Sequence, residues 1–441
     1  MKKFHIYTLL LAIMPFLSSL QIGGGDRLGF LYAATVSQYS LPVDTLPVDT
    51  LVADSLPPVP WEQHVRLQLD SLIANSSLLE TTQLGLMVWD LDGDSAFYYH
   101  NHRQRMRPAS TMKLMTAVTA LDLYGGNHPF TTELRSRGTI SGHTLYGDLV
   151  CVGGMDPAFD GGDLQVFVDR IRSAGIDTIC GRIVADRSMK DTLLLGEGWC
   201  WDDDNPCLSP LLVSRKDNFL QRFTRELQSA GIVLCDTCNQ LSTLNSPLGP
   251  TGRFQNGVGK ELSTLFSLSH SFDQILTRMM KQSDNLYAEC MFYHNALATS
   301  RPATQKNART AVRQMIQRLG YDPARYRVAD GSGLSLYNYV SAELLTSLLR
   351  YAWRSDRIRE HLVPSLPLAG VDGTLKDRMQ KSKAYRNVRA KTGTLTGISS
   401  LAGYLTAANG HLFAFCIINQ GVVKAKDGKD FQDKVCRYLC E

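Results

Sequence analysis

Short strand-like segments near both ends of the folded part of the chain limit its possible folds more than any other feature. Four segments are apolar or alternate in polarity as strands do: Leu84–Trp89, Ala96–Tyr99, Ser399–Thr406 and His411–Ile418. Asp92-Gly93 lies between the first two and favours a tight hairpin turn. Strands at both ends with helices between them predict an α+β fold, in which both termini build one antiparallel sheet that helices cover.

Apolar residues at helical spacing predict the helices beside these strands. The segments are Trp61–Ile73, Leu268–Ala288, Ala311–Leu319, Leu344–Trp353 and Phe431–Leu439. A further helix is expected to begin near Ser110 and to end near Gly125-Gly126, because glycine commonly follows the last turn of a helix.

Between about residues 130 and 265 the pattern changes to short apolar runs and glycine turns. Two helices predicted there, Asp163–Ala174 and Phe219–Ala230, both end in Ser-Ala-Gly-Ile, which indicates two related αβ units. We predict that residues 130–265 form a smaller α/β domain inserted into a main domain of residues 61–129 and 266–441.

The N-terminal segment is typical of an export signal. Lys2 and Lys3 precede a mostly apolar run, Ile6–Leu20, which is too short and too interrupted to span a membrane comfortably. We place the signal peptide within residues 1–34 and expect a periplasmic protein, peripheral to the membrane or cell wall at most. Residues 35–60 contain a tandem Leu-Pro-Val-Asp-Thr repeat, which predicts an extended tether.

The net charge and the number of cysteines limit the partners and the cellular compartment that can be expected. The 441 residues carry a formal net charge of +4 without a long basic run, so nucleic acid is not an expected partner. Ten cysteines suit an oxidising compartment. The four cysteines of Cys235-x-x-Cys238, Cys200 and Cys207 have several possible roles. They can form disulfides, remain buried thiols, act as a redox pair or bind zinc.

The segment Arg107-Pro-Ala-Ser110-Thr-Met-Lys113 carries the first candidate catalytic residues. Positions i and i+3 share a helix face, so the Ser110 hydroxyl and the Lys113 amine are expected side by side. Serine needs an adjacent base to act as a nucleophile, and a desolvated lysine loses its proton readily. Alone, the motif is also compatible with a capping serine and a solvated lysine.

Two further motifs follow in the chain. In Ser283-Asp-Asn285, the serine is a candidate proton relay between Lys113 and a leaving group, and the asparagine a candidate to hold a substrate amide. Alone, this motif is equally a turn at a helix end, where Asp284 is solvated or a local cap.

Lys391-Thr392-Gly393-Thr394 opens a strand expected to run on to Tyr404. Its lysine and threonines can bind a carboxylate, and the glycine lets the backbone approach a ligand closely. The N–H groups of Ser110 and Thr394 are candidates for an oxyanion hole. The three motifs in this order form the signature set of penicillin-interacting enzymes.

With these motifs, the sequence resembles the low-molecular-mass class C penicillin-binding proteins, the D-alanyl-D-alanine carboxypeptidase/endopeptidase family of the PBP4 (DacB) type (peptidase family S13). The resemblance covers nearly all of residues 61–418. Further matching strings are Gly147–Val150, Gly153–Pro157, Asp186–Ser188, Gly198–Asp203, Asp330–Ser335 with Tyr337 and Asn338, and Leu366–Leu375.

The resemblance implies a serine penicilloyl-enzyme (DD-peptidase/β-lactamase-like) fold without metal or organic cofactor. The implied activity is removal of the terminal D-Ala from peptidoglycan peptides ending in D-Ala-D-Ala, or cleavage of their cross-links, with β-lactam antibiotics as substrate mimics. The implied catalytic residues are Ser110, which forms the acyl-enzyme, with Lys113, Ser283, Asn285 and Lys391. The implied substrate-binding residues are Thr392, Gly393, Thr394 and Asp156, the last as a partner for the ammonium of diaminopimelate.

Three departures from the family pattern affect the expected substrate. The interval between Lys113 and Ser283 is short, which predicts that a further small domain of longer members is missing. Leu336 stands where the family has an arginine that grips the diaminopimelate carboxylate. Thr396 replaces a glutamine that some members use in the same subsite.

Other interpretations remain open at this point. A β-lactamase or esterase on the same site needs a base that hydrolyses the acyl-enzyme, and the sequence offers no identifiable one. A catalytically decayed cell-wall-binding protein is the other alternative, although all three motifs are intact. Asp330 and Ser332 are either site residues or turn formers, and Asp372-Gly373-Thr374 is expected to be a structural turn.

Overall fold

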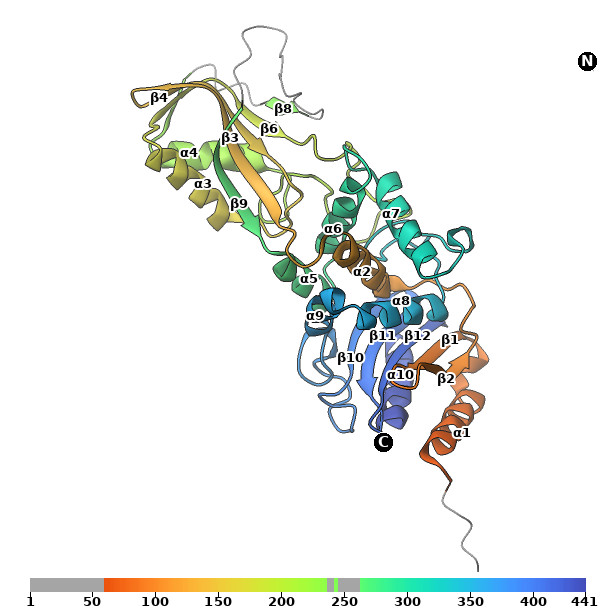
Figure 1. Cartoon of the computed structure of the whole chain (residues 1–441). Coiled ribbons are helices and arrows are strands. Elements are labelled where there is room, and N and C mark those ends of the chain that lie inside the picture. Colours follow the sequence, from red (N-terminus) through yellow and green to blue (C-terminus); the bar gives the residue numbers. More distant parts are fainter. Residues whose placement is uncertain (1–58, 236–241, 245–261) are drawn as a thin grey trace, which may run out of the picture. The chain divides into compact units, whose positions relative to one another are not determined.

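The computed structural model describes residues 59–235, 242–244 and 262–441 (Figure 1). Val59–Glu441 forms one compact unit. The predicted signal peptide, nearly all of the predicted tether and Cys238 lie outside the described residues. No helix of the described ranges combines the length and the apolar character that a membrane crossing requires.

Both ends of the compact unit build one five-stranded antiparallel sheet, as predicted. Its strands run in the order β10-β11-β12-β1-β2, so strands from the two ends pair along β1 and β12. The bounds are β1 Gln83–Asp90, β2 Ser95–His100, β10 Arg389–Leu395, β11 Gly397–Thr406 and β12 Leu412–Val422. The prediction of one strand from Lys391 to Tyr404 was wrong, because the chain reverses at Gly397, which has a φ of 78°.

Alternating side chains of this sheet enter two different cores. On β12, Phe413, Phe415 and Ile417 pack toward α1 Trp61–Ala74 and α10 Ala425–Cys440. Their neighbours Ala414, Cys416 and Ile418 face the opposite core, which contains most of the remaining helices. A period of two along a strand places successive side chains on opposite faces, so the sheet is buried on both sides.

The second core holds the helices that carry the candidate site. They are α2 Met112–Tyr124, α5 Phe272–Lys281, α6 Asn285–Leu297, α7 Gln305–Arg318, α8 Ala342–Arg354 and α9 Asp356–Ser365. α2 ends at Gly125, in a left-handed conformation with a φ of 70°, as predicted. The helix predicted over Leu268–Ala288 was wrong, since the segment contains the end of a strand and two helices separated by Gln282–Asp284.

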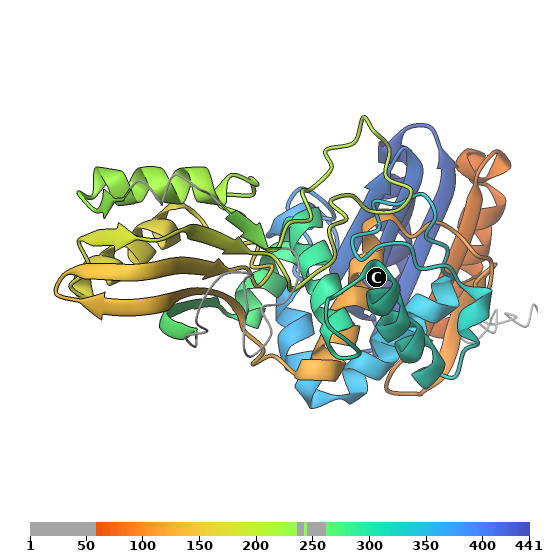
Figure 2. The same ribbon diagram turned by 90° about the horizontal axis from the view of Figure 1, so that it is seen from above.

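A second, seven-stranded sheet occupies the middle of the sequence. Its strands are β3 Phe130–Ser141, β4 Thr144–Val152, β5 Thr178–Cys180, β6 Ile183–Asp186, β7 Val233–Leu234, β8 Ser242–Leu244 and β9 Ser263–His270. α3 Gly161–Ser173 and α4 Phe219–Ser229 share one hydrophobic core with this sheet, and Figure 2 shows α4 alongside the strands. The boundaries of an inserted domain at residues 130 and 265 stay a prediction.

The two predicted αβ units are visible in this sheet. Each helix is followed by a glycine in the left-handed region, Gly175 or Gly231, and then by a strand. The two strands, β5 and β7, pair in parallel. Cys180 and Cys235, which end the two units, form a disulfide. Among the described residues, Cys200 and Cys207 are free thiols and join no group of possible metal ligands.

A buried histidine predicts how stability depends on pH. His294 of α6 hydrogen-bonds the Gly154 carbonyl at 2.8 Å and the ring of His128 at 2.9 Å. Burial lowers the pKa of His294 to about 3, whereas an unfolded histidine titrates near 6.5. Below pH 6.5 the unfolded chain therefore binds a proton that the folded chain does not, and stability falls as the pH falls toward 3.

We expect His294→Gln to flatten this acid limb of the stability curve. Urea unfolding at pH 7 and pH 5 measures it, since the difference between the two free energies of unfolding shrinks in the variant. The control, His64→Gln, changes an exposed histidine and should keep the wild-type difference. An unchanged slope in His294→Gln would show that other groups govern acid stability.

Candidate active site

The Ser110 hydroxyl and the Lys113 amine meet at the start of α2. Ser110 lies in a single 3₁₀ turn, Ala109–Thr111, directly before the helix, and Lys113 follows within its first turn. Lys113 Nζ donates to Ser110 Oγ at 2.9 Å. Three residues along one helix face therefore bring a hydroxyl and an amine into hydrogen-bond contact, as predicted.

Lys113 is enclosed by oxygen atoms from three parts of the chain. Its Nζ also donates to Asn285 Oδ1 at 2.7 Å and to the Ser332 carbonyl at 2.8 Å, and its side chain has no exposed surface. Burial lowers the pKa of Lys113 to about 8, although the negative charges of Asp330, Glu289 and Asp284 oppose this shift. An amine with this pKa is partly neutral near pH 7 and can accept a proton.

Ser283 contacts a different lysine from the one expected. Lys391 Nζ donates to Ser283 Oγ at 2.9 Å and to the Thr392 carbonyl at 2.7 Å. The hydrogen bonds of the described residues include none between Ser283 and Lys113. Lys391 is fully buried, and burial together with the charge of Lys113 holds its pKa well below the usual range.

The turn between α5 and α6 positions Ser283 and Asn285. Ser283 has a φ of 58°, a left-handed conformation that is uncommon for serine. Asp284 caps α6 by accepting from the N–H groups of Leu286 and Tyr287, and it forms ion pairs with two arginines, Arg215 and Arg278. Asp284 is therefore a cap, one of its two predicted roles, and its carboxylate is largely buried rather than solvated.

Strand β10 runs close beside Ser110. A Cβ atom on Gly393 would lie 2.9 Å from the Ser110 nitrogen and 2.7 Å from the Pro108 carbonyl, so only glycine allows this approach. The Thr392 hydroxyl donates to the Thr374 hydroxyl at 2.7 Å, and Thr394 is exposed. Asp372 binds Lys281 at 2.7 Å, so the segment Asp372–Thr374 supports the strand, as predicted.

A buried loop after α7 completes the enclosure of Lys113. Glu289 accepts from the N–H groups of Gly331 at 3.1 Å and of Ser332 at 2.7 Å, and thereby holds the Ser332 carbonyl at the amine. Asp330 accepts from the indole of Trp199 at 2.9 Å and from the N–H group of Gly333 at 2.8 Å. Asp330 and Ser332 therefore shape the loop.

Sequence reasoning missed Glu289 and the carbonyl of Ser332. Glu289 follows Asn285 by four residues and therefore lies on the same face of α6, which is a signal that was available. Its complete burial, which raises its pKa to about 8, depends on the loop packed against it. The role of the Ser332 carbonyl could not be predicted from the sequence, because every residue has a backbone carbonyl.

Among the described residues, no hydrogen bond or ion pair joins Asp156 to this cluster. Its carboxylate accepts from the Ala158 N–H group at 3.0 Å and binds His270 Nδ1 at 2.7 Å, and no part of its side chain is exposed. In this structure the Asp156 carboxylate is buried and bound to His270, so a ligand has no access to it. The role expected of Asp156, a partner for a substrate ammonium, would require His270 to move away.

The structure also locates Leu336 and Thr396, the two residues that depart from the family pattern in the expected substrate subsite. Leu336 follows the buried loop, and its carbonyl accepts from Arg107 Nε at 2.9 Å. Thr396 lies exposed in the reversal between β10 and β11. Neither side chain carries a charge.

The α+β architecture is that of the penicillin-binding-protein fold. Penicillin binding protein 4 (dacB) from Haemophilus influenzae matches with a TM-score of 0.73 at 23% identity, over 84% of this chain and 99% of that structure. A penicillin G-acylated predatory endopeptidase of Bdellovibrio bacteriovorus, in complex with an immunity protein, matches with a TM-score of 0.53 at 16% identity, over 80% of this chain and 91% of that one.

The sequence comparisons define the family. The profile described as the D-Ala-D-Ala carboxypeptidase 3 (S13) family matches residues 65–237 and 256–441, so the chain belongs to this family. The D-alanyl-D-alanine carboxypeptidase DacB of Haemophilus influenzae is 28% identical over 412 residues, which cover 77% of this chain and 85% of the relative. The predicted enzyme class, a serine-type D-Ala-D-Ala carboxypeptidase, is confirmed.

Proposed function

We propose that the enzyme acts through an acyl-enzyme on Ser110. Ser110 Oγ attacks the carbonyl carbon of the penultimate D-Ala, and its proton passes to neutral Lys113 Nζ. The C–N bond then breaks, and the terminal D-Ala leaves with a proton on its nitrogen. Water hydrolyses the Ser110 ester in the second step. The observation that carries the proposal is the 2.9 Å contact between Ser110 Oγ and a buried amine whose pKa is about 8.

The remaining motif residues have proposed roles in binding and proton transfer. Ser283 and Lys391, in contact at 2.9 Å, deliver the proton to the departing nitrogen. Asn285 holds the substrate amide, and Lys391 with the two threonines of β10 binds the terminal carboxylate. The N–H groups of Ser110 and Thr394 stabilise the oxyanion of the tetrahedral intermediate.

Labelling with a fluorescent penicillin, followed by mass spectrometry of the adduct, tests this proposal. We expect a stable adduct on Ser110 in the wild type and none in Ser110→Ala. Absence of an adduct on folded wild-type protein would favour the decayed binding protein. Turnover of penicillin without accumulation of an adduct would favour the β-lactamase.

We propose two leaving groups for the same chemistry. A free terminal D-Ala makes the reaction a carboxypeptidase cleavage, and a D-Ala bonded to the side-chain amine of another peptide makes it an endopeptidase cleavage. The structural match named as an endopeptidase supports the second. Purified muropeptides, one ending in D-Ala-D-Ala and one cross-linked, separate the two, since each yields a different product by chromatography.

We also propose that the protein works outside the cytoplasm, in the periplasm. Lys2, Lys3 and the apolar run Ile6–Leu20 support export, and the disulfide between Cys180 and Cys235 suits an oxidising compartment. Fractionation of cells with N-terminal sequencing of the mature protein tests this. An intact N-terminus in the cytoplasmic fraction would contradict it.

The pKa of Lys113 predicts how acylation depends on pH. Only the neutral amine accepts the Ser110 proton, so below pH 8 the rate constant for acylation by penicillin should fall about tenfold for each pH unit. Above about pH 8.5 it should level off. Stopped-flow measurement of acylation between pH 6 and 9 checks this, and a rate constant that is flat or falls with rising pH would exclude Lys113 as the base.

A further inference from the structure

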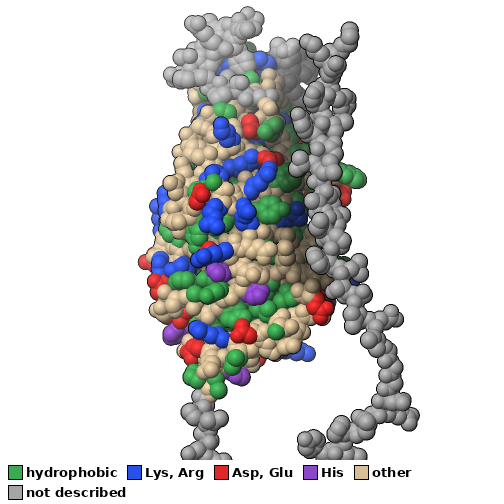
Figure 3. Space-filling view, turned by 90° about the vertical axis from the view of Figure 1, so that its right-hand side faces the viewer, with side chains coloured by type: hydrophobic (Ala, Val, Ile, Leu, Met, Phe, Trp, Pro, Cys, Tyr) green, Lys and Arg blue, Asp and Glu red, His purple; other side chains and the backbone are tan. Residues whose placement is uncertain are grey.

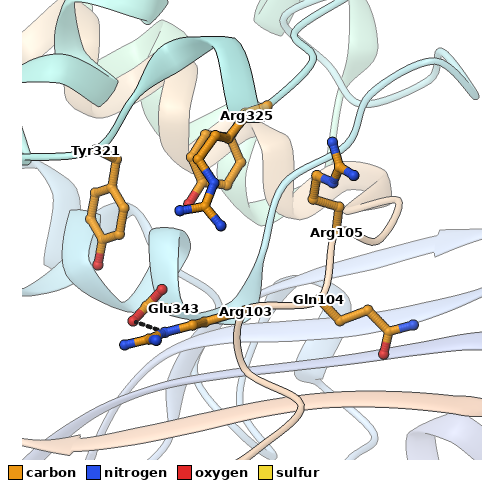
Figure 4. A pocket seen from close by; sticks show the side chains of 7 residues that line it. Arg103, Gln104, Arg105, Tyr321, Arg325 and Glu343 are labelled. Atoms are coloured by element: carbon orange, nitrogen blue, oxygen red, sulfur yellow. Dashed lines mark hydrogen bonds and ion pairs between the residues drawn. The ribbon is translucent and has the colours of Figure 1, made fainter.

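A basic pocket lies beside the segment that leads to the nucleophile. Its volume is about 740 Å³, and its charged lining consists of Arg103, Arg105, Arg325 and Glu343, with Tyr321 and Tyr326 as aromatic walls. Figure 4 shows Arg103 and Arg105 entering from the segment before Ser110, and Tyr321 and Arg325 from the segment after α7. The pocket is thus built where two distant parts of the sequence meet.

The positive charge of this pocket is only partly balanced. Arg103 Nε donates to Glu343 at 3.2 Å, which neutralises one cation. Among the described residues, no carboxylate forms an ion pair with Arg105 or Arg325, and both side chains are exposed. The segments that build the pocket lie at the right-hand side of Figure 1, on the face shown in Figure 3, where Lys and Arg side chains gather across the middle.

A second hollow adjoins the pocket. It shares Arg105 and Arg325 with the first and adds Tyr339 to the lining. The guanidinium of Arg107 lies over the ring of Tyr339, 5.5 Å from its centre, and is tied to the Leu336 carbonyl. Arg107 itself is three residues before Ser110. Arg107 therefore connects the wall of the second hollow, at Tyr339, with the segment that carries Ser110.

The distance suits a peptide substrate bound to Ser110. Arg105 precedes Ser110 by five positions, so their Cα atoms lie at most about 18 Å apart, which is the length of about five extended peptide residues. An acyl peptide anchored at Ser110 can therefore place a side group at Arg105 and Arg325. Guanidinium groups present paired N–H donors that match the two oxygens of a carboxylate.

We propose that this pocket binds a free carboxylate of the peptidoglycan peptide, several residues before the scissile bond, through Arg105 and Arg325. The inference rests on the proposed function, because it assumes that a peptide is anchored at Ser110. The pocket would make the enzyme select peptides whose acidic residues carry free carboxylates over peptides whose carboxylates are amidated. A carboxylate is favoured over a phosphate polymer because Arg105 lies within the reach of a peptide anchored at Ser110.

The test compares two pentapeptides that end in D-Ala-D-Ala and differ only in whether the acidic residue is free or amidated. Their affinities are measured by calorimetry on Ser110→Ala protein, so no turnover is required. The readout is the ratio of the two affinities. We expect the free acid to bind about tenfold more tightly, a difference of about 1.4 kcal/mol. This preference should shrink at high salt, because exposed charges are screened.

The double variant Arg105→Ala/Arg325→Ala, in the same Ser110→Ala background, should bring the ratio close to one. The matched control Arg172→Ala removes an exposed arginine of α3 and should keep the wild-type ratio. An equal affinity for both peptides before mutation, or a ratio that survives the double variant, would overturn the proposal. Polyphosphate that binds to the protein without changing the ratio of the two peptide affinities would also overturn it. Failure of the proposed function is seen separately, as absence of a penicillin adduct on Ser110.

Discussion

Replacing Lys113 by methionine is expected to slow acylation of Ser110 by penicillin by about 10²–10⁴-fold, the usual contribution of a general base. Methionine has a similar length and fills the buried site without charge. The Ser110 hydroxyl would keep its place but lose the group that takes its proton. The measurement is the second-order rate constant of acylation, followed by fluorescence or by mass spectrometry.

Folding has to be separated from chemistry in this experiment. Methionine leaves Asn285 Oδ1 and the Ser332 carbonyl without their donor, so the melting temperature must be measured alongside the rate. The pH profile provides a second criterion, since the rise toward pH 8 should disappear with the amine. A folded Lys113→Met protein that acylates at the wild-type rate would show that another group acts as the base.

The second large effect is expected at Gly333, in the loop that encloses Lys113. Gly333 has a φ of 81°, and an added Cβ atom would lie 1.9 Å from the carbonyl of Ala109, the residue before Ser110. Alanine there combines the cost of a left-handed conformation with that of a steric overlap, about 2–5 kcal/mol in all. We expect Gly333→Ala to lower the free energy of unfolding by this amount and to reduce acylation, because the loop carries the Ser332 carbonyl.

The matched control is Gly410→Ala, in the turn between β11 and β12. Gly410 has a φ of 87°, but a Cβ atom there would meet nothing within 4 Å. Gly410→Ala should lower the free energy of unfolding only by the cost of the left-handed conformation, about 1–2 kcal/mol. It should be acylated at the wild-type rate. Urea unfolding of both variants measures the difference. Equal losses of unfolding free energy in the two variants would mean that the close contact of Gly333 with the Ala109 carbonyl does not affect stability.

Helices and strands with a regular pattern were predicted well, and errors arose where the chain changes direction. The segment Leu268–Ala288 has apolar residues at intervals that suit a helix, but Ser271 caps a helix that begins at Phe272, after a strand. Ser283 then adopts a left-handed conformation that ends this helical run before α6 begins. Propensity does not reveal such a break, because the packing of the surrounding helices holds it in place.

The order of the motifs was sufficient for assigning the family and for naming Ser110, Lys113, Ser283, Asn285 and Lys391 as a set, since local spacing and residue chemistry carry that information. Which lysine contacts which serine was decided by tertiary structure, as the pairing of Lys391 with Ser283 demonstrates. The enclosure of Asp156 by His270 and the support of Lys113 by Glu289 and the Ser332 carbonyl were likewise decided there. The physical reason is that desolvation and hydrogen bonding depend on neighbours from distant parts of the chain, which no local pattern specifies.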